Sequence, residues 1–264
     1  MSRTVVILAY PDCQLLDVSG PWQVFASAND LSGSCLYRLH LAADAPGSVA
    51  TNSGLPLLAD TAWRDISALG PVDTLLVAGG RGVTLQRQRA ELLTALHDQA
   101  GQVRRLGSIC TGAFLLAAAG LLDERQATTH WRHCAQLASD YPRVRVVPDA
   151  LYVESGGHFT SAGVTAGIDL ALSLLEADHG SALAGQVARE LVLFLRRPGG
   201  NPSSVKCCAA RTAPRVRCEN CSTGSTPTLP RRTGWKRWPI RSASRRATFR
   251  GCFASSLRRH QAPI

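Results

Sequence analysis

Lysine is absent from the first 205 residues of this 264-residue chain, where 15 arginines face 18 aspartates and glutamates. That part therefore carries a formal charge of about −3. The last 59 residues contain 12 arginines, 2 lysines and one acidic residue, Glu219. The net charge of +10 at pH 7 thus belongs to the C-terminal segment, and a chain that is basic throughout is excluded.

Long apolar runs are missing as well. The longest, AFLLAAAGLL at residues 113–122, is too short to span a bilayer. The early run VVILAY is shorter than the core of a signal peptide and runs into Pro11. Of the nine cysteines, only Cys13, Cys35, Cys110 and Cys134 precede residue 206, a sparse usage typical of reduced proteins. We therefore expect a cytoplasmic protein without membrane contacts.

Two kinds of apolar pattern alternate along the chain up to about residue 197. Residues 3–10 form a continuous β-branched run, typical of a central parallel strand. Further strand patterns occupy residues 36–44, 72–82, 106–109 and 144–157, and residues 48–60 suggest a hairpin. Helical patterns occupy residues 20–29, 86–99, 112–117, 132–140, 165–180 and 182–197. This alternation predicts an α/β three-layer sandwich with a mostly parallel central sheet.

Cys110 lies in the stretch RRLGSICTGAFLLAAAGLL, where the strand pattern gives way to a helix. A thiol at a helix N-terminus is favoured as the nucleophilic thiolate, because the helix dipole and unpaired N–H groups stabilise negative charge. The alternative is a small buried apolar side chain. The loops at residues 10–17, 79–82 and 110–112 all follow predicted strands, and ligands of such sheets bind at those strand ends.

Five segments together resemble one family in sequence and in order. They are LLDVSGPWQVF, LLVAGG, SICTGAFLLAAAGLL, ATTHW and TSAGVTAGIDLALSLLE. They resemble the ThiJ/PfpI superfamily, which has the class I glutamine amidotransferase-like fold with a nucleophile elbow. The similarity covers roughly residues 4–197 and is greatest for the GlxA-like AraC-type transcriptional regulators and the related isonitrile hydratases.

The resemblance implies roles for particular residues. Cys110 matches the elbow cysteine, Asp17 the acid that hydrogen-bonds its sulfur, and His130 a histidine often found near that thiol. Thr111 and the loop at Gly79 and Gly80 match the oxyanion-binding surroundings. In isonitrile hydratases the roles fall on the aspartate, the cysteine and the following threonine. Two alternatives stay open: Asp17 as a helix N-cap and His130 as a structural histidine.

Two departures from the superfamily narrow the chemistry. Glutamine amidotransferases have a late His-x-Glu pair, whereas the nearest match here, His158 to Thr160, lacks the acid. PfpI-type proteases follow the elbow cysteine with histidine, whereas Thr111 follows Cys110 here. Glutaminase and protease activities are therefore not expected, and neither a cofactor nor a metal is expected.

The segment after residue 205 does not fit the regulator pattern. Only 7 of its 59 residues are Val, Ile, Leu or Phe, which is too little apolar material to offset the entropy of ordering. The CENC at 218–221 lacks a second well-placed pair for zinc. Shifting the reading frame of a GC-rich back-translation yields a stretch resembling an AraC-type recognition helix. We therefore predict a domain at 1–197, a linker at 198–205 and a disordered basic tail at 206–264, a frameshifted remnant of a helix-turn-helix domain.

Two functions from different classes follow. The first is the ligand-sensing domain of an AraC-family transcriptional regulator whose DNA-binding part is lost or out of frame. Its partners would be a small-molecule ligand and a second copy of the chain, and the tail supports no sequence-specific DNA binding. The alternative is an isonitrile hydratase-like lyase acting through Cys110, Asp17 and Thr111, so enzyme status stays open. A redox sensor acting through Cys110 would need a depressed thiol pKa.

Overall fold

A seven-stranded, mostly parallel sheet organises the part of the chain that this computed structural model describes, residues 2–193. Its strand order is β10-β11-β7-β6-β1-β2-β5. The bounds are Arg3–Leu8 for β1, Tyr37–Ala43 for β2, Thr61–Ala62 for β5, Thr74–Val77 for β6, Arg105–Ile109 for β7, Tyr152–Ser155 for β10 and His158–Ser161 for β11. Every pair is parallel except β10 with β11, so the predicted α/β fold is confirmed.

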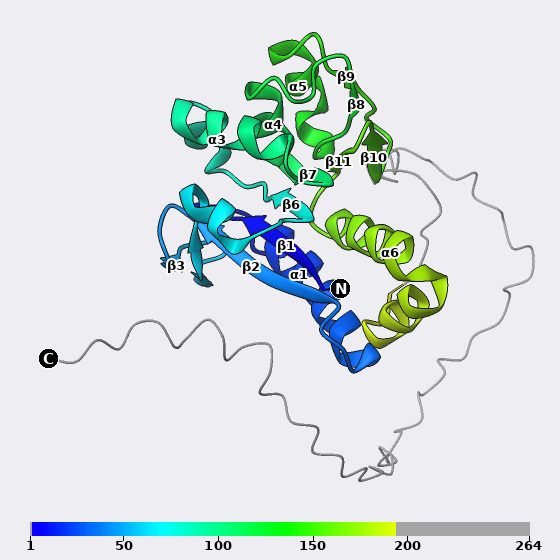
Figure 1. Ribbon diagram of the computed structural model, residues 1–264. Helices are drawn as coiled ribbons and strands as arrows, with labels where there is room; N and C mark the ends of the chain where they lie inside the picture. The colour runs from blue at the N-terminus through cyan, green and yellow to red at the C-terminus, as the bar shows by residue number, and fades with distance from the viewer. Residues whose placement is uncertain (1, 194–264) are drawn as a thin grey trace, which may run out of the picture. The chain divides into compact units, whose positions relative to one another are not determined.

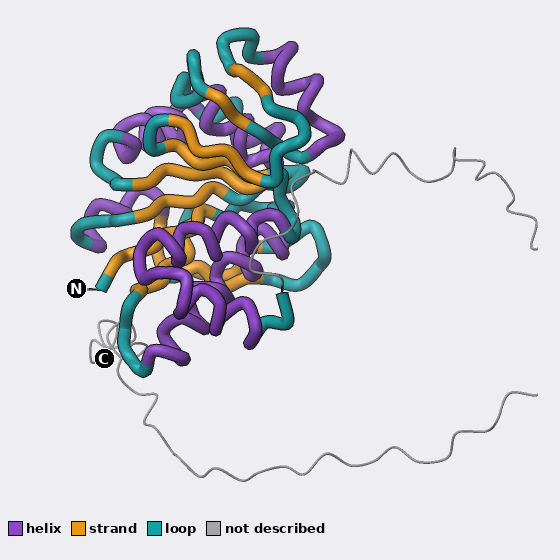
Figure 2. The backbone as a smooth tube through the Cα atoms, turned by 90° about the vertical axis from the view of Figure 1, so that its right-hand side faces the viewer, coloured by secondary structure: helices purple, strands orange, loops and turns teal. Residues whose placement is uncertain are grey.

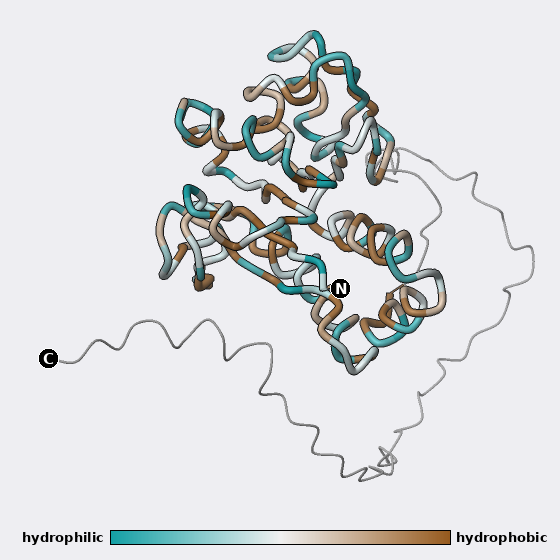
Figure 3. The backbone as a smooth tube through the Cα atoms, viewed as in Figure 1, coloured by the Kyte–Doolittle hydropathy of each residue, from teal (hydrophilic) through white to brown (hydrophobic). Residues whose placement is uncertain are grey.

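Helices lie on both sides of this sheet (Figures 1 and 2). On one side, α1 (Leu15–Ser32) packs against α6 (Ala166–Glu190). The others are α2 (Val83–Gln86), α3 (Ala90–Ala100), α4 (Ala113–Ala118) and α5 (Cys134–Asp140). Because both faces are covered, the central strands β1 and β6 are mostly apolar, and hydrophobic residues run through them in Figure 3.

Smaller elements complete the described part of the chain. The predicted hairpin is the antiparallel pair β3 (Gly47–Val49) and β4 (Leu57–Ala59). Strands β8 (Gln126–Ala127) and β9 (Arg145–Val146) pair in parallel. Three 3₁₀ turns are η1 (Trp63–Leu69), η2 (Cys110–Gly112) and η3 (Trp131–His133).

The sequence patterns missed some boundaries. Helix α1 begins at Leu15, before the predicted start at residue 20, and continues through Gly20 and Pro21. Both residues are buried, so packing against the core outweighs the local tendency of Gly-Pro to break a helix. Strand β11 was not predicted, because His158 and the short polar run after it lack a clear alternation. The two predicted helices after residue 165 form α6, interrupted at Gly180 with φ of 83°.

An ion cluster ties α6 to the sheet at the end opposite the elbow. The buried Asp178 carboxylate binds Arg105 and Arg104, each at 2.8 Å, and accepts a 3.0 Å hydrogen bond from Tyr37. Burial alone would raise the pKa of Asp178, but the hydrogen bonds from Arg105 and Arg104 outweigh it and hold that pKa below its usual value. The cluster therefore stabilises the native packing of α6 at neutral pH.

Some predictions lie outside the described residues. These are the end of the helix pattern at 182–197, the linker at 198–205 and the basic tail at 206–264. Within residues 2–193, no helix is both long enough and apolar enough to cross a bilayer.

Candidate functional site

Cys110 occupies a strained turn between a strand and a helix. Strand β7 ends at Ile109, Cys110 opens the turn η2, and α4 begins at Ala113. The backbone φ of Cys110 is 56°, a region that residues with a Cβ rarely adopt. The hydroxyl of Thr129 donates a 2.8 Å hydrogen bond to the Cys110 carbonyl and helps hold this conformation. The predicted strand–elbow–helix unit is confirmed, with the Cys110 residue only 7% exposed.

Asp17 reaches the elbow from the first turn of α1, where it is completely buried. One carboxylate oxygen, Oδ1, accepts a 2.7 Å hydrogen bond from the backbone N–H of Val164. The other, Oδ2, accepts one of 3.1 Å from Gly79, and the carboxyl group also hydrogen-bonds the Cys110 thiol. Gln14 occupies the N-cap position of α1, so the N-cap alternative for Asp17 is wrong. Its side chain instead joins three loops around the sulfur.

Burial governs the protonation of this pair. It raises the pKa of Asp17 to about 6, although hydrogen bonds from Val164, Gly79 and Cys110 pull the value down. Burial, and then the Asp17 charge, raise the pKa of the Cys110 thiol well above its usual value. The N–H and hydroxyl of Thr111 favour the thiolate but do not overcome these effects. Burial and the Asp17 carboxyl group therefore oppose the thiolate that the helix N-terminus favours.

Thr111 connects the elbow to the glycine loop after β6. Its hydroxyl donates a 3.1 Å hydrogen bond to the Gly80 carbonyl and accepts one of 2.9 Å from the Gly80 N–H. The N–H groups of Gly79 and Gly80 are thus occupied by Asp17 and Thr111. Gly80 and Thr111 line the pocket above the thiol, and an oxyanion role for Gly79, Gly80 and Thr111 stays a prediction.

The loop between β11 and α6 contributes two residues that the sequence reasoning did not single out. Gly163 has φ of 87°, and a Cβ there would overlap Cys110 Cβ and lie 2.8 Å from its sulfur. Only glycine allows the two loops to approach so closely. The next residue, Val164, supplies the N–H that binds Asp17 and also lines the pocket. The only signal for them was their place within TSAGVTAGIDLALSLLE.

His130 lies at the pocket wall. Among the hydrogen bonds of residues 2–193, none joins His130 to the Cys110 thiol. It caps η3, where Nδ1 accepts a 3.4 Å hydrogen bond from the Arg132 N–H. Burial, followed by the charges of His133 and Arg132, lowers the pKa of His130. The structure thus places His130 beside the cavity, with a capping contact of the kind expected of a structural histidine.

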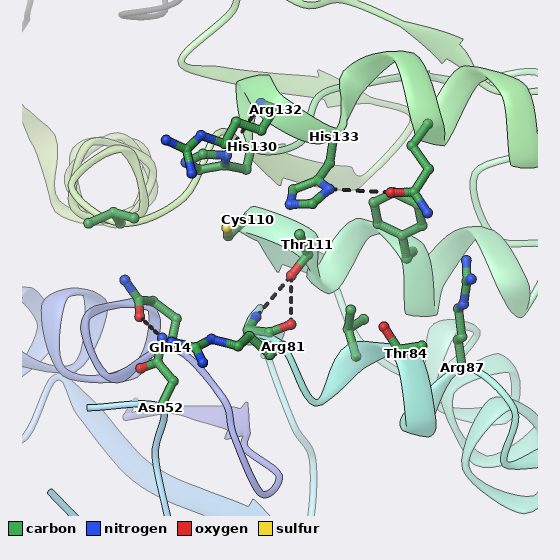
Figure 4. Close-up of a pocket in the computed structure, with 15 residues that line it drawn as sticks. Gln14, Asn52, Arg81, Thr84, Arg87, Cys110, Thr111, His130, Arg132 and His133 are labelled. Atoms are coloured by element: carbon green, nitrogen blue, oxygen red, sulfur yellow. Dashed lines mark hydrogen bonds between the residues drawn. The ribbon is translucent and has the colours of Figure 1, made fainter. Parts of the chain in front are cut away.

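A pocket of about 390 Å³ opens above Cys110 (Figure 4). Its walls come from α4, α5, the α2 segment, the turns η2 and η3 and the loops after β1, β3, β6 and β11. Arginines from two sides face it: Arg81 and Arg87 from the α2 segment and Arg132 from η3. Sequence reasoning missed these three, since arginine is frequent in the chain. Within residues 2–193, no group of three or more His, Cys, Asp or Glu is placed to hold a metal.

Comparison with known proteins agrees with this geometry. The model of the DJ-1/PfpI family matches residues 3–177. The chain belongs to the DJ-1/PfpI family. The resemblance inferred from the sequence is therefore confirmed.

Similar DJ-1/PfpI proteins include both an enzyme and regulators. Isonitrile hydratase from Pseudomonas putida is 33% identical over 88% of this chain and 94% of its own length. The transcriptional regulator GbdR from Pseudomonas aeruginosa is 33% identical over 74% of this chain. That match spans 51% of GbdR, so the chain covers about half the length of such a regulator.

Two solved structures are similar to this chain in fold. An AraC family transcriptional regulator from Pseudomonas putida superposes with a TM-score of 0.62 at 26% identity, over 72% of this chain and 100% of that one. DJ-1beta from Drosophila melanogaster gives a TM-score of 0.62 at 20% identity, over 74% of this chain and 100% of that one. The second likeness concerns the fold alone.

Proposed function

We propose that the DJ-1/PfpI domain of this chain is the ligand-sensing domain of an AraC-family transcriptional regulator. The observation that carries the proposal is the pocket of about 390 Å³ that opens above the buried Cys110 side chain. A cavity of this size accommodates a small metabolite. Burial and the Asp17 charge raise the pKa of Cys110, which disfavours the redox alternative because that alternative needs a depressed thiol pKa.

Similarity to regulators supports this proposal. Regulators such as GbdR share 33% identity with this chain across 194 residues. On this proposal the DNA-binding half is lost or out of frame in residues 206–264. Resequencing the gene tests that part: a frame that encodes AraC-type helices after residue 205 supports it, and an uninterrupted gene for the present tail with no such frame contradicts it.

A chimeric regulator tests sensing directly. Residues 1–197 would be joined to the DNA-binding half of GbdR and a reporter measured during growth on a panel of small metabolites. We expect at least one metabolite to change reporter output, and Thr84→Trp, which fills the pocket from α2, to abolish the response. Leu85→Trp, a change at the exposed neighbouring residue that does not line the pocket, is the matched control. A chimera that binds DNA but responds to no metabolite contradicts sensing.

A second candidate, isonitrile hydration, is favoured by a specific observation. The Asp17 carboxyl group hydrogen-bonds the Cys110 thiol, and Thr111 follows at the pocket floor. Isonitrile hydratase from Pseudomonas putida is also similar over 94% of its length. The three residues that the sequence resemblance assigned to this chemistry are thus neighbours in space.

The chemistry would use the thiol and the carboxyl group as a pair. The sulfur of Cys110 bonds to the isonitrile carbon while its proton passes through Asp17 to that carbon, giving a thioimidate. Water then adds across the C=N bond, with its oxygen bonding to carbon and one proton going to nitrogen. The C–S bond breaks as the new hydroxyl group gives its proton through Asp17 to sulfur. The product is an N-substituted formamide. A carboxyl group with a pKa of about 6 is suited to both proton transfers near neutral pH.

Turnover separates the two candidates. Purified protein would be incubated with several isonitriles and formamide measured by chromatography. Turnover that Cys110→Ala abolishes and Cys134→Ala, another buried cysteine, preserves would establish the hydratase. Absence of turnover in correctly folded protein leaves sensing as the proposal.

We also propose a cytoplasmic homodimer as the working form, following the expectation from the superfamily. Sedimentation equilibrium on the purified chain tests the dimer, and cell fractionation tests the location. A monomer at micromolar concentration contradicts the first, and recovery in a membrane fraction contradicts the second.

A further inference from the structure

Basic side chains line the walls of the pocket. Three arginines and two histidines line it, and within residues 2–193 no aspartate or glutamate does. The histidines are His130 and His133. Charge of one sign around a cavity attracts the opposite charge in a ligand.

The three arginines differ in their partners. Arg87 is neutralised by Asp140 through a 2.9 Å ion pair. Neither Arg81 nor Arg132 forms an ion pair with any residue in the described part of the chain. Arg132 only stacks over Trp131, 5.0 Å from its ring centroid. Two guanidinium groups at the pocket therefore have free hydrogen-bonding capacity.

These two groups approach the thiol from different sides. In Figure 4, Arg81 lies with Gln14 and Asn52 on one side of Cys110, and Arg132 lies with His130 on the other. Arg81 follows the glycine loop after β6, whereas Arg132 belongs to η3. A planar oxyanion matches the fork of donors that a guanidinium presents.

Besides Asp140, which is paired with Arg87, Asp17 lies near the pocket and acts in the opposite sense. Asp17 is fully buried behind the elbow, and its two oxygens are occupied by Val164 and Gly79. It therefore repels an anion only from behind Cys110, at the floor. The arginines lie at the walls of the pocket. An anionic group of a ligand would bind there, and the rest of the ligand would point to the thiol.

We infer that the pocket selects small molecules carrying an oxyanion, a carboxylate in the first place, bound by Arg81 and Arg132. This rests on the proposed sensing function, since it names the chemical class of its ligand. A neutral metabolite of the same shape binds more weakly, because it forms no charge-assisted hydrogen bond with either guanidinium group.

Alkylation of Cys110 tests the charge of the pocket without knowledge of the ligand. Iodoacetate is anionic and iodoacetamide is neutral, and in both the sulfur of Cys110 bonds to the CH2 carbon and displaces iodide into solvent. The ratio of their rate constants cancels the fraction of thiolate and reports the local potential. The rates would be measured for the full chain at low salt by mass spectrometry of the peptide containing Cys110.

We expect Arg81→Gln and Arg132→Gln each to lower the ratio of iodoacetate to iodoacetamide rates about two- to fivefold. Added salt should shrink the effect. Arg38→Gln, an exposed arginine at the start of β2, is the matched control and leaves the ratio unchanged. An unchanged ratio in both pocket variants overturns the inference, and so does a Cys110 that neither reagent reaches before the protein is unfolded.

Thermal shifts with defined probes then identify the oxyanion. Succinate, its neutral counterpart succinamide and inorganic phosphate would be compared on wild-type protein and on the Arg81→Gln, Arg132→Gln double variant. Stabilisation by succinate that the double variant loses supports a carboxylate, and stabilisation by phosphate alone assigns the oxyanion to phosphate. Equal stabilisation by succinamide and succinate overturns the charge selection. If the reporter of the chimera responds only to neutral metabolites, this inference is overturned and the sensing function stands. If the alkylation ratio depends on Arg81 and Arg132 but the chimera responds to no metabolite, the sensing function alone is overturned.

Discussion

The Asp17→Asn variant tests whether the buried carboxyl group at the elbow makes stability depend on pH. The pKa of Asp17 rises from 3.8 to about 6 on folding because the group is buried. A carboxyl group that binds its proton more tightly in the folded state stabilises the fold when protonated. The contribution is therefore complete below the unfolded value and is lost as the pH rises through about 6. It amounts to about 3 kcal/mol in full, of which about 2 kcal/mol is present at pH 4.5.

Asparagine removes this pH dependence and adds a constant cost. The two carboxyl oxygens accept from Val164 and Gly79, whereas an amide has one oxygen. One buried N–H loses its acceptor, which costs about 1–3 kcal/mol at every pH. The stability advantage of wild type over Asp17→Asn should thus shrink by about 2 kcal/mol between pH 4.5 and pH 7.5.

Urea unfolding across that pH range is the assay, because the difference between two variants cancels the other titrating groups. Asp30→Asn, an exposed carboxylate in the same helix, is the matched control and should give a flat difference. A difference between wild type and Asp17→Asn that is also independent of pH, or that grows as the pH rises, would refute the reasoning.

Three further predictions concern the elbow and the ion cluster. Gly163→Ala should lower the free energy of unfolding by at least about 2 kcal/mol, since its Cβ meets Cys110. Gly180→Ala, with a similar φ but no neighbour within 4 Å, should cost clearly less, and equal losses in thermal unfolding would contradict the crowding argument. Asp178→Ala leaves the buried Arg105 without its carboxylate partner and should lower the free energy of unfolding by about 3–5 kcal/mol at pH 7. This loss should become smaller as the pH falls through the lowered pKa of Asp178. In the same urea unfolding experiment, Glu91→Ala, which removes an exposed ion pair, should change the free energy of unfolding by almost nothing. Burial and the Asp17 charge raise the pKa of Cys110. The rate of its alkylation by iodoacetamide should therefore still increase about tenfold per pH unit near pH 8, and it should be higher in Asp17→Asn. A rate that does not change above pH 7 would mean that Cys110 is a thiolate at neutral pH, which contradicts the prediction.

Local patterns predicted most elements of the sheet. The β-branched run at β1 and the apolar run at β6 are buried on both faces, and such runs are visible without any partner. The start of α1 and the strand β11 were missed because their stability comes from contacts with other elements. Pro21 within α1 and His158 in β11 are locally unfavourable or ambiguous, so a pattern search places them outside regular structure.

The same distinction applies to the candidate site. Cys110, Asp17 and Thr111 were identified from motifs, and the structure places Cys110 and Thr111 at the pocket with Asp17 buried behind Cys110. Gly163 and Val164 were not, because their importance depends on how closely the loop before α6 approaches the elbow. The roles of all these residues in binding or catalysis stay proposals that the experiments above would test.

The sequence by itself determined the alternation of strands and helices, the elbow at Cys110 and the family, since each is written in neighbouring residues or in the order of motifs. Only the tertiary structure decided the direction in which the pKa of the thiol shifts and the charge of the pocket. The helix N-terminus at Cys110 favours a thiolate, but burial and the adjacent Asp17 carboxyl group, distant in sequence, outweigh it. Likewise, Arg81 and Arg132 are ordinary surface arginines until folding places both at one cavity without an acidic partner, because electrostatic potential depends on distances that the order of residues does not contain.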